Sequence, residues 1–548
     1  MFKRIIRSFS FNKIEPCLFA LCILLTAWPV LVTKYYTTLD GPSHLYNASL
    51  VKELIFGQKD NISDLYCLNP VLVPNWTGHF IMAFFCLFFP AFLSQKLMML
   101  IYFIFTPLFF RKSLLFFKPA NSFGLYLIFP LLHNHLFYFG FFNMCLGITA
   151  MFASLSYFLN SDRKITVKQY IFLTLLLGIT FFSHIITFLL TIALLIAFST
   201  VFLDVHKDKN HDRIADFSAF KKRLIWIFIC AIPSVILSIN YFVRIHATGP
   251  RPLISLAERL QWIVDFRPVM AFGCGPPLLD YGRVLSALFA LLIAVFIFLA
   301  IKHKKLFTAN KVSFDYKNTV TSIIFLIFWI VLLILYFLLP NFILVTDRLL
   351  VLSYVFFFCW LALIKFPKWI GALSLVALIS LQANIVSVYY NYAIETRDDG
   401  PKLEEVATSI PEGNLVLVLN YSGNWLYDHA SGYVGANRRL ALLENYEAGL
   451  QWFPVNWNSR RFFTDTLAFG APNKDLICSF FVNEPDSLFF SVRQKNGLVI
   501  PVEYVVQIGE NQDKQSACFF KTKTRLETSY KIIRRNNFCK LYIRKQKR

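Results

Sequence analysis

The feature that most constrains this chain is a series of apolar runs that recurs from residue 16 to about residue 388 and then stops. A transmembrane helix needs about 20 mostly apolar residues. With 57% hydrophobic and 16% charged residues, a soluble fold would have too few polar side chains to cover its surface. We therefore predict a polytopic α-helical membrane protein with about eleven transmembrane helices, at 16–32, 97–110, 123–137, 143–159, 168–183, 185–203, 224–242, 284–301, 319–339, 349–364 and 369–388.

The basic residues predict the orientation of these helices. Cytoplasmic loops of membrane proteins are enriched in Lys and Arg. If the N-terminus is cytoplasmic, the basic clusters all fall on the cytoplasmic side, at 111–112, 163–164, 207–223, 302–305 and 365–368. Topology then explains many of the basic residues behind the net charge of +22, and we expect no nucleic-acid partner. We expect an integral protein of the inner or plasma membrane whose C-terminal domain is extracytoplasmic.

Two regions differ in composition. Residues 1–390 form the predicted transmembrane domain, with longer outer loops at about 34–96 and 243–283. Residues 391–548 show short strand-like runs amid turn residues, at 414–420, 478–482 and 502–508, which predicts an extracytoplasmic α/β domain. An apolar stretch at 78–93 would place the later basic clusters outside if it crossed the membrane, so we expect an interfacial or re-entrant helix there.

The first outer loop opens with an acidic residue at the membrane boundary. Asp40 follows the first predicted span, and apolar residues at helical spacing between Ser43 and Phe56 predict a helix along the outer membrane surface. Asp40 could simply cap this helix, because Asp shortly before Pro is a common helix start. It could also serve as a general base, since it can face a lipid head group and a soluble substrate together. The two roles are compatible.

The sequence DGPSHL at 40–45 resembles the start of the first outer loop in the C-class glycosyltransferases (GT-C). These polytopic membrane enzymes take a sugar from a polyprenyl-phosphate carrier, and the many spans, the second long outer loop and the mixed C-terminal domain are also similar. The resemblance implies that Asp40 is catalytic and that the donor is a polyprenyl-phosphate sugar. Many metal-dependent members have adjacent or closely spaced acids here, whereas Gly41 and Pro42 follow Asp40, so we expect no metal and no other cofactor.

Further polar residues gather on the same predicted outer face. We expect His44, His135, His184 and Arg348 to bind substrate. A guanidinium group binds phosphate oxygens bidentately, which makes Arg348 the candidate for the carrier phosphate. The alternative for each histidine is an ordinary packing or interfacial role. The alternative for Arg348 is an interfacial anchor or an ion-pair partner of Asp347.

The sequence therefore favours transfer of a sugar from a polyprenyl-phosphate carrier to an extracytoplasmic glycan, lipid or protein acceptor, with Asp40 as general base. One rival is a transporter or flippase, but few ionisable residues lie within the predicted spans and no repeated halves are visible. Another rival is a non-catalytic membrane protein of envelope assembly. That function would leave the acid of the first loop and the outer-face His and Arg residues unexplained.

Overall fold

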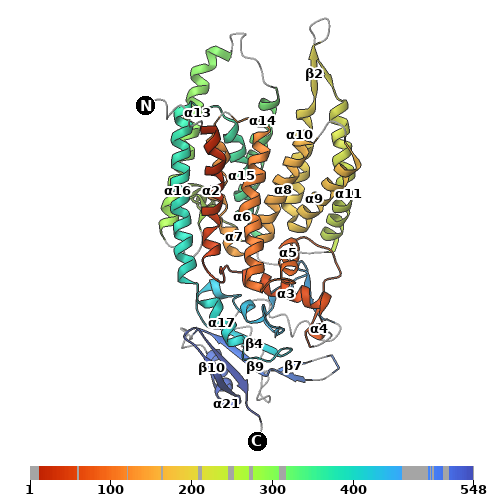
Figure 1. The fold of residues 1–548 in the computed structure, drawn as a ribbon, viewed down its shortest axis with the longest axis vertical. Helices are drawn as coiled ribbons and strands as arrows, with labels where there is room; N and C mark the ends of the chain where they lie inside the picture. The colour runs from red at the N-terminus through yellow and green to blue at the C-terminus, as the bar shows by residue number, and fades with distance from the viewer. Residues whose placement is uncertain are drawn as a thin grey trace. The chain divides into compact units, whose positions relative to one another are not determined.

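The computed structural model describes residues 11–57, 61–119, 121–161, 165–207, 213–244, 252–270, 276–307, 316–459, 491–493, 495–496, 499–509 and 517–546. Within these ranges, nine helices are long and apolar enough to cross a membrane (Figure 1). They are α2 (Phe11–Leu31), α6 (Ala91–Leu115), α8 (Phe142–Asn160), α10 (Ile185–Ser199, continued by η3, Thr200–Phe202), α11 (Ser218–Arg244), α13 (Pro276–Phe307), α14 (Tyr316–Leu338), α15 (Val345–Leu363) and α16 (Lys368–Glu395). The predicted membrane class is confirmed.

The helix predicted at 168–183 is present as α9 (Val167–Ser183), an apolar helix of 17 residues that is shorter than the nine. One expected span has a different structure. Residues 123–137 do not form one helix and instead fold as η1 (Ser122–Tyr126), η2 (Phe129–Leu131) and the start of α7 (His135–Phe139). Pro130 lies at the start of η2, where its missing N–H and its ring disfavour a continuous α-helix. Hydropathy alone does not detect this interruption.

The backbone of this irregular segment is held by close packing and by side chains. A Cβ atom on Gly124 would lie 2.7 Å from the Cβ atom of Ala362, so only glycine fits there. The amide of Asn134 donates to the carbonyl of Leu131 over 2.7 Å, and the Tyr126 hydroxyl donates to the carbonyl of Glu15 over 3.1 Å. The first bond satisfies a carbonyl of the segment itself, and the second joins the segment to α2.

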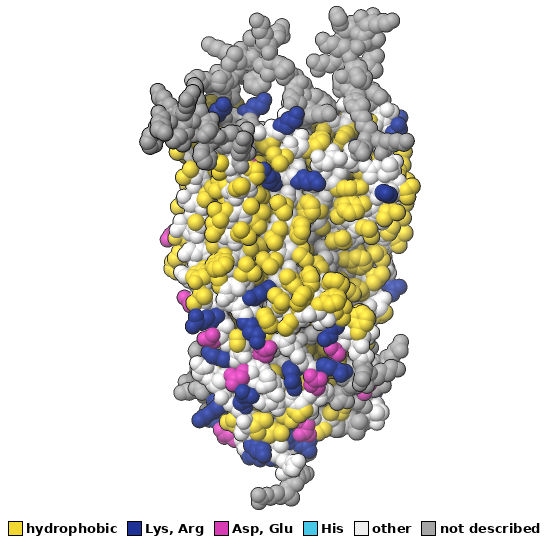
Figure 2. Space-filling view, viewed as in Figure 1, with side chains coloured by type: hydrophobic (Ala, Val, Ile, Leu, Met, Phe, Trp, Pro, Cys, Tyr) yellow, Lys and Arg dark blue, Asp and Glu magenta, His cyan; other side chains and the backbone are white. Residues whose placement is uncertain are grey.

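The outward faces of the long helices are apolar. Leu24, Phe228, Leu291 and Val376 are each more than half exposed. Figure 2 shows hydrophobic side chains over the face that these helices form. Apolar side chains exposed at this density fit a lipid environment.

The chain divides into two compact units. Unit 1 comprises Met1–Pro29, Leu100–Tyr138 and Met144–Tyr392, and unit 2 comprises Val30–Met99, Phe139–Asn143 and Ala393–Arg548. Most of the predicted first outer loop thus belongs to the same unit as the C-terminal region. The second outer loop lies in unit 1, where it contains α12 (Leu256–Val264) and η4 (Arg267–Val269).

Unit 2 is built around a five-stranded mixed sheet with strand order β10-β11-β9-β4-β5. The strand β4 (Leu415–Asn420) runs parallel to β5 (Ala441–Leu442) and to the central strand β9 (Tyr504–Ile508), while β11 (Cys539–Arg544) runs antiparallel to β9 and to β10 (Tyr530–Arg535). The strands predicted at 414–420 and 502–508 are therefore present, and 478–482 lies outside the described residues. The sheet is accompanied by α17 (Asp399–Ala407), η6 (Trp425–Tyr427), α18 (Gly432–Gly435), η7 (Tyr446–Gly449) and α21 (Ala517–Ser529).

The first-loop elements of unit 2 are α3 (Gly41–Phe56), α4 (Asn61–Leu65), β1 (Tyr66–Leu68) and α5 (Thr77–Phe85). The strand β1 pairs antiparallel with β6 (Val455–Trp457), which joins the first loop to the C-terminal region. The helix α5 has nine residues, or about 14 Å, which is too short to cross a hydrocarbon core of about 30 Å. Its interfacial position stays a prediction. Two further hairpins are β2 (Asp204–Lys207) with β3 (Arg213–Asp216), and β7 (Ser491–Arg493) with β8 (Val499–Pro501).

Candidate functional site

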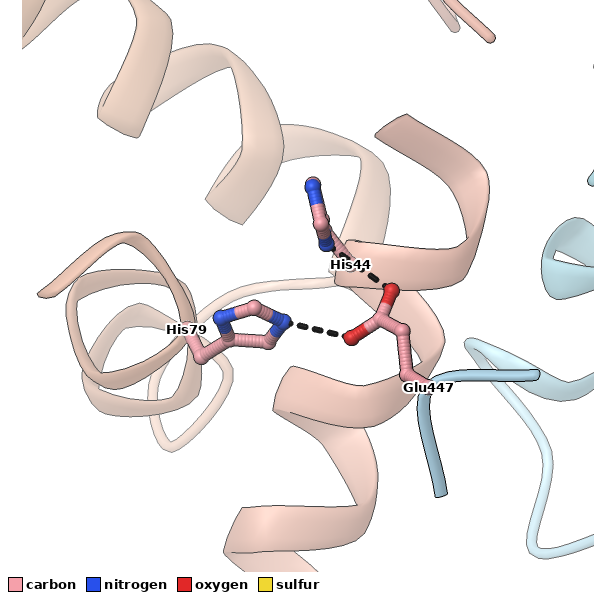
Figure 3. A group of neighbouring side chains, drawn as sticks. All are labelled: His44, His79 and Glu447. Carbon is pink, nitrogen blue, oxygen red and sulfur yellow. Dashed lines mark hydrogen bonds and ion pairs between the residues drawn. The ribbon is translucent and has the colours of Figure 1, made fainter. Parts of the chain in front are cut away.

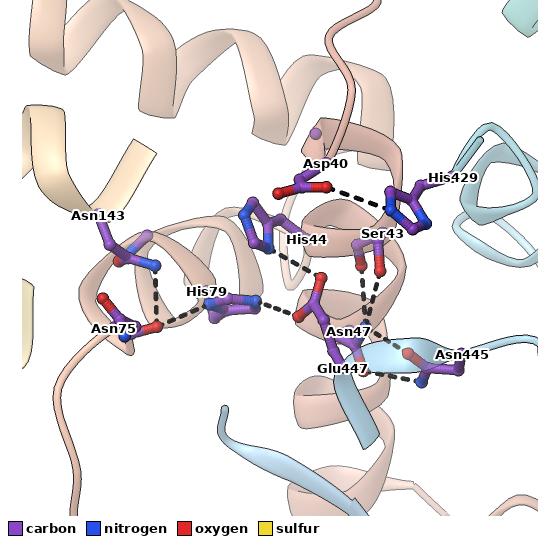
Figure 4. A network of polar contacts seen from close by, with 12 residues as sticks. Asp40, Ser43, His44, Asn47, Asn75, His79, Asn143, His429, Asn445 and Glu447 are labelled. Atoms are coloured by element: carbon purple, nitrogen blue, oxygen red, sulfur yellow. Dashed lines mark hydrogen bonds and ion pairs between the residues drawn. The ribbon is translucent and has the colours of Figure 1, made fainter. Parts of the chain in front are cut away.

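Asp40 lies immediately before the first residue of α3. Its backbone N–H donates to the carbonyl of Phe139 over 3.0 Å, and its carbonyl accepts from the N–H of His44 over 2.9 Å. Its side chain makes no capping hydrogen bond with the helix. Instead, the Oδ1 atom lies 3.4 Å from Nε2 of His429, and the side chain is 13% exposed (Figure 4). The carboxylate is thus directed away from the helix backbone, which the capping interpretation did not anticipate.

Two glycines allow the segment around Phe139 to pack against the start of α3. Gly140 has φ +88°, and a Cβ atom there would lie 2.7 Å from the backbone nitrogen of Gly41 and 2.9 Å from Cβ of Asp40. A Cβ atom on Gly41 would lie 2.2 Å from Oγ1 of Thr38. A side chain at position 140 would therefore require a shift of the backbone, and one at position 41 would require neighbouring side chains to move.

The imidazole of His429 and the phenol of Tyr446 flank Asp40. The two rings stack with their centroids 4.1 Å apart. Burial lowers the pKa of His429 to about 4. The charge of Glu447 opposes this shift, and His44 adds to it. Burial raises the pKa of Tyr446 well above its ordinary value, and the carboxylates of Asp40 and Glu447 raise it further. Both rings are therefore uncharged at neutral pH.

A second group of polar side chains joins α3, α5 and η7. Glu447 accepts at both carboxylate oxygens: Oε1 lies 2.8 Å from Nδ1 of His44, and Oε2 lies 2.8 Å from Nε2 of His79 (Figure 3). All three side chains are at most 5% exposed. We call these residues the His–Glu–His cluster. They are the described residues whose donor atoms could hold a metal ion, and those atoms all lie within 4.8 Å of one another.

The charges of this cluster are unevenly distributed. Burial alone would raise the pKa of Glu447, but His44 and His79 hold it well below its ordinary value. Burial would lower the pKa of His44, yet the carboxylate of Glu447 outweighs it and the net shift is upward. The pKa of His79 is lowered, because burial there exceeds the effect of Glu447. The carboxylate is therefore ionised within a buried site.

Amide side chains hold the surrounding segments in register. Asn47 in α3 and Asn445 exchange two amide hydrogen bonds of 2.9 Å, and both residues are buried. Asn143 donates to the carbonyl of Asn75 over 2.8 Å and accepts from the N–H of Gly78 over 2.7 Å (Figure 4). Asn75 has φ +71°, a conformation that asparagine tolerates better than most residues. These contacts fix where α5 begins, and thereby the position of His79.

The other predicted site residues belong to unit 1. His135 lies with Nε2 3.0 Å from Oδ1 of Asp347, and Nε of Arg267 lies 2.6 Å from the same oxygen. Arg348, in the first turn of α15, acts electrostatically on His184. His184 itself caps α10, because its Nδ1 accepts from the N–H of Ile186 over 3.2 Å. The structure thus brings Arg348 near His184 and places His135 against Asp347.

Sequence reasoning found Asp40 and His44 but missed His79, His429 and Glu447. His79 lies within the stretch 78–93, where the apolar character of the neighbouring residues dominates the pattern. His429 and Glu447 follow Asp40 by about 400 positions, and no spacing pattern in one sequence links them to it. For His79, the only local signal was a single histidine within an apolar run.

No family model matches this sequence, and no curated protein matches it. Among solved structures, the chain is similar to ArnT from Cupriavidus metallidurans in the apo state, with 12% identity and a TM-score of 0.43 over 97% of this chain and 98% of the other. It is also similar to ArnT from the same organism bound to undecaprenyl phosphate, with 11% identity and a TM-score of 0.40 over 96% and 97%. At these scores we transfer no residue role from either structure.

Proposed function

We propose that this protein is a membrane glycosyltransferase that moves a sugar from a polyprenyl-phosphate carrier to an extracytoplasmic acceptor, with Asp40 as general base. The observation that carries the proposal is the position and orientation of the Asp40 carboxylate. It lies at a helix start without capping the helix and is turned toward His429. An acid that is held by its backbone at a helix start, with its carboxylate turned toward His429 and Tyr446, is positioned for proton transfer.

In the proposed step, Asp40 takes the proton of an acceptor hydroxyl as its oxygen attacks the anomeric carbon of the donor sugar. A new bond forms from that carbon to the acceptor oxygen, the bond from the carbon to the carrier phosphate oxygen breaks, and the polyprenyl phosphate leaves. A single displacement of this kind inverts the anomeric centre. The acceptor is a glycan, a lipid or a protein.

The surroundings of Asp40 support this role. His429 and Tyr446 are uncharged and stacked, so they confine the carboxylate without a permanent positive charge that would weaken it as a base. The carbonyl of Phe139 holds the Asp40 backbone. A base held by its neighbours needs little reorganisation in the transition state.

We also assign the leaving phosphate to Arg348, with His184 and His135 as further substrate contacts. A guanidinium group stabilises the charge that develops on the departing phosphate. Arg348 also acts electrostatically on His184, which supports assigning both side chains to one substrate site. We further propose that unit 2 is extracytoplasmic, in an inner or plasma membrane, where it can meet the acceptor. His44 contacts Glu447, and its role in substrate binding stays a prediction.

The test uses the full chain purified in detergent with a panel of polyprenyl-phosphate sugars and acceptors. Asp40→Asn should lower the transfer rate by about 10²–10⁴-fold, the range for loss of a general base. The matched control is Asp398→Asn. Asp398 also precedes a helix, α17, with a similar backbone conformation and no capping hydrogen bond by its side chain, but it is exposed.

The control variant should transfer at the rate of the wild type, and both variants should keep its thermal midpoint. Equal rates for Asp40→Asn and Asp398→Asn would contradict the role of Asp40. Absence of turnover with every polyprenyl-phosphate sugar would contradict the donor class and favour a transporter or an assembly protein.

A further inference from the structure

The His–Glu–His cluster has more hydrogen-bond acceptors than its rings can serve. Nδ1 of His44 faces Glu447, and the same ring also hydrogen-bonds the backbone of Gly140. Nε2 of His79 faces Glu447, and its Nδ1 lies 3.2 Å from the carbonyl of Asn75. Each imidazole therefore has an oxygen acceptor on both sides.

A neutral imidazole has one N–H and one bare nitrogen. Two neutral rings offer two N–H groups to these four oxygen acceptors, so two of the contacts join a bare nitrogen to an oxygen atom. Such a contact is unfavourable unless a further proton or a positive ion lies between the two atoms.

We propose that Nδ1 of His44, Nε2 of His79 and the carboxylate of Glu447 bind a divalent transition-metal ion, with zinc as the first candidate. Two imidazoles and one carboxylate are a frequent ligand set for zinc. The three donor atoms lie within 4.8 Å of one another. Metal–ligand distances of about 2.0–2.2 Å can be reached with a modest opening of the present contacts.

The groups around the cluster match those of metal sites in proteins. Metal-bound histidines usually donate their second ring nitrogen to a carbonyl or carboxylate, as His79 does to Asn75. Phe453 packs against both imidazoles, with centroid distances of 5.7 and 5.6 Å, and limits access of water. We expected no metal because Gly41 and Pro42, rather than a second acid, follow Asp40. That expectation concerned only ligands that are adjacent to Asp40 in sequence. The cluster draws its ligands from three separate segments.

The ion would fix the helix that carries Asp40. His44 lies one turn after Asp40 in α3, so a bond from His44 to a metal held by α5 and η7 restrains the start of that helix. This inference does not depend on glycosyl transfer. Its test measures metal content and stability, which are independent of activity.

The full chain, free of any affinity tag, is treated with a chelator, dialysed and titrated with ZnCl₂ in detergent. We expect one tightly bound zinc per chain and a higher thermal midpoint with zinc than without it. His44→Gln and His79→Gln should each lower the affinity by at least about 10-fold, the loss typical of perturbing a metal site. His429→Gln is the matched control, because it removes another buried imidazole of unit 2 that is not a ligand. It should keep the stoichiometry of the wild type.

A second measurement needs only the wild type, in case the variants fail to fold. X-ray absorption at the zinc edge should show two imidazole ligands and oxygen at about 2.0–2.2 Å. A wild-type chain that binds no zinc, iron, manganese or nickel would overturn the proposal and leave an ordinary hydrogen-bonded cluster. Zinc bound with no imidazole ligand, or zinc bound equally by the wild type and the His44→Gln and His79→Gln variants, would overturn it as well.

Discussion

Gly140→Ala should disturb the Asp40 site through the backbone, without changing any polar side chain. Gly140 has φ +88°, which costs an L-residue about 1–2 kcal/mol. Its new methyl group would also lie 2.7–2.9 Å from backbone and side-chain atoms of Gly41 and Asp40. Overpacking of this kind costs about 1–3 kcal/mol. We therefore expect unit 2 to lose about 2–5 kcal/mol of stability.

Two other glycines of unit 2 separate these contributions. Gly413 has φ +77°, and a methyl group added there would have nothing within 4 Å, so Gly413→Ala should show the conformational cost alone, about 1–2 kcal/mol. Gly449 has open space and no positive φ, so Gly449→Ala should be neutral or stabilise by up to about 1 kcal/mol.

The assay is the thermal midpoint of the purified chain in detergent, read alongside the transfer rate. The order of destabilisation should be Gly140→Ala, then Gly413→Ala, then Gly449→Ala. To relieve the contact, Asp40 must shift by a sizeable fraction of an ångström, and a misplacement of 1 Å can cost about 10²-fold in rate. Gly140→Ala should therefore lose at least about 10-fold in transfer. A midpoint for Gly140→Ala equal to that of Gly413→Ala would refute the close packing of Gly140 on Asp40.

Two further predictions concern buried polar groups of unit 2. Burial raises the pKa of Glu444 from 4.5 to about 7, so the folded state binds the proton more tightly than the unfolded state. The stability that this protonated Glu444 contributes is fully present below pH 4.5 and falls by about 3 kcal/mol as the pH rises to about 7. Glu444→Gln should flatten this part of the profile of thermal midpoint against pH. An unchanged profile would contradict the raised pKa of Glu444. Asn47→Ala and Asn445→Ala each leave one buried amide without its partner, at a cost of about 1–3 kcal/mol. The double variant should cost less than the two single costs added, and strict additivity in a double-mutant cycle would show that the two amides do not interact.

The sequence predicted the membrane helices well because lipid imposes a simple condition on them. A segment that crosses the hydrocarbon core must be apolar over about 20 residues, and that property is local. The prediction differed at 123–137, where Gly124 packs against Ala362 and Pro130 interrupts the helix. Hydropathy measures the preference of side chains for lipid but not whether the backbone can remain one helix.

The site was only partly predictable for the opposite reason. Asp40 could be found because its signal is local: an acid between an apolar run and a helix with Pro near its start. Glu447 carries no such signal, although it is fully buried and contacts two histidines. Its meaning depends on side chains that are distant in sequence, and only the fold brings them together.

The domain boundary expected at residue 390 rested on the end of the apolar runs. The two units divide nearby, between Tyr392 and Ala393, but the first outer loop belongs to the same unit as the C-terminal region. The first-loop helices are short and leave polar groups that they cannot satisfy alone. Tyr46 in α3 donates to the carbonyl of Leu440 over 2.8 Å, and Asn69 donates to the carbonyls of Gln451 and Phe453 over 2.9 Å each. Because buried polar groups must be paired, these contacts with the C-terminal region stabilise α3 and its neighbours. The position of Asp40 thus depends on residues beyond position 390, and variants of the C-terminal region that loosen α3 should lower the proposed transfer rate.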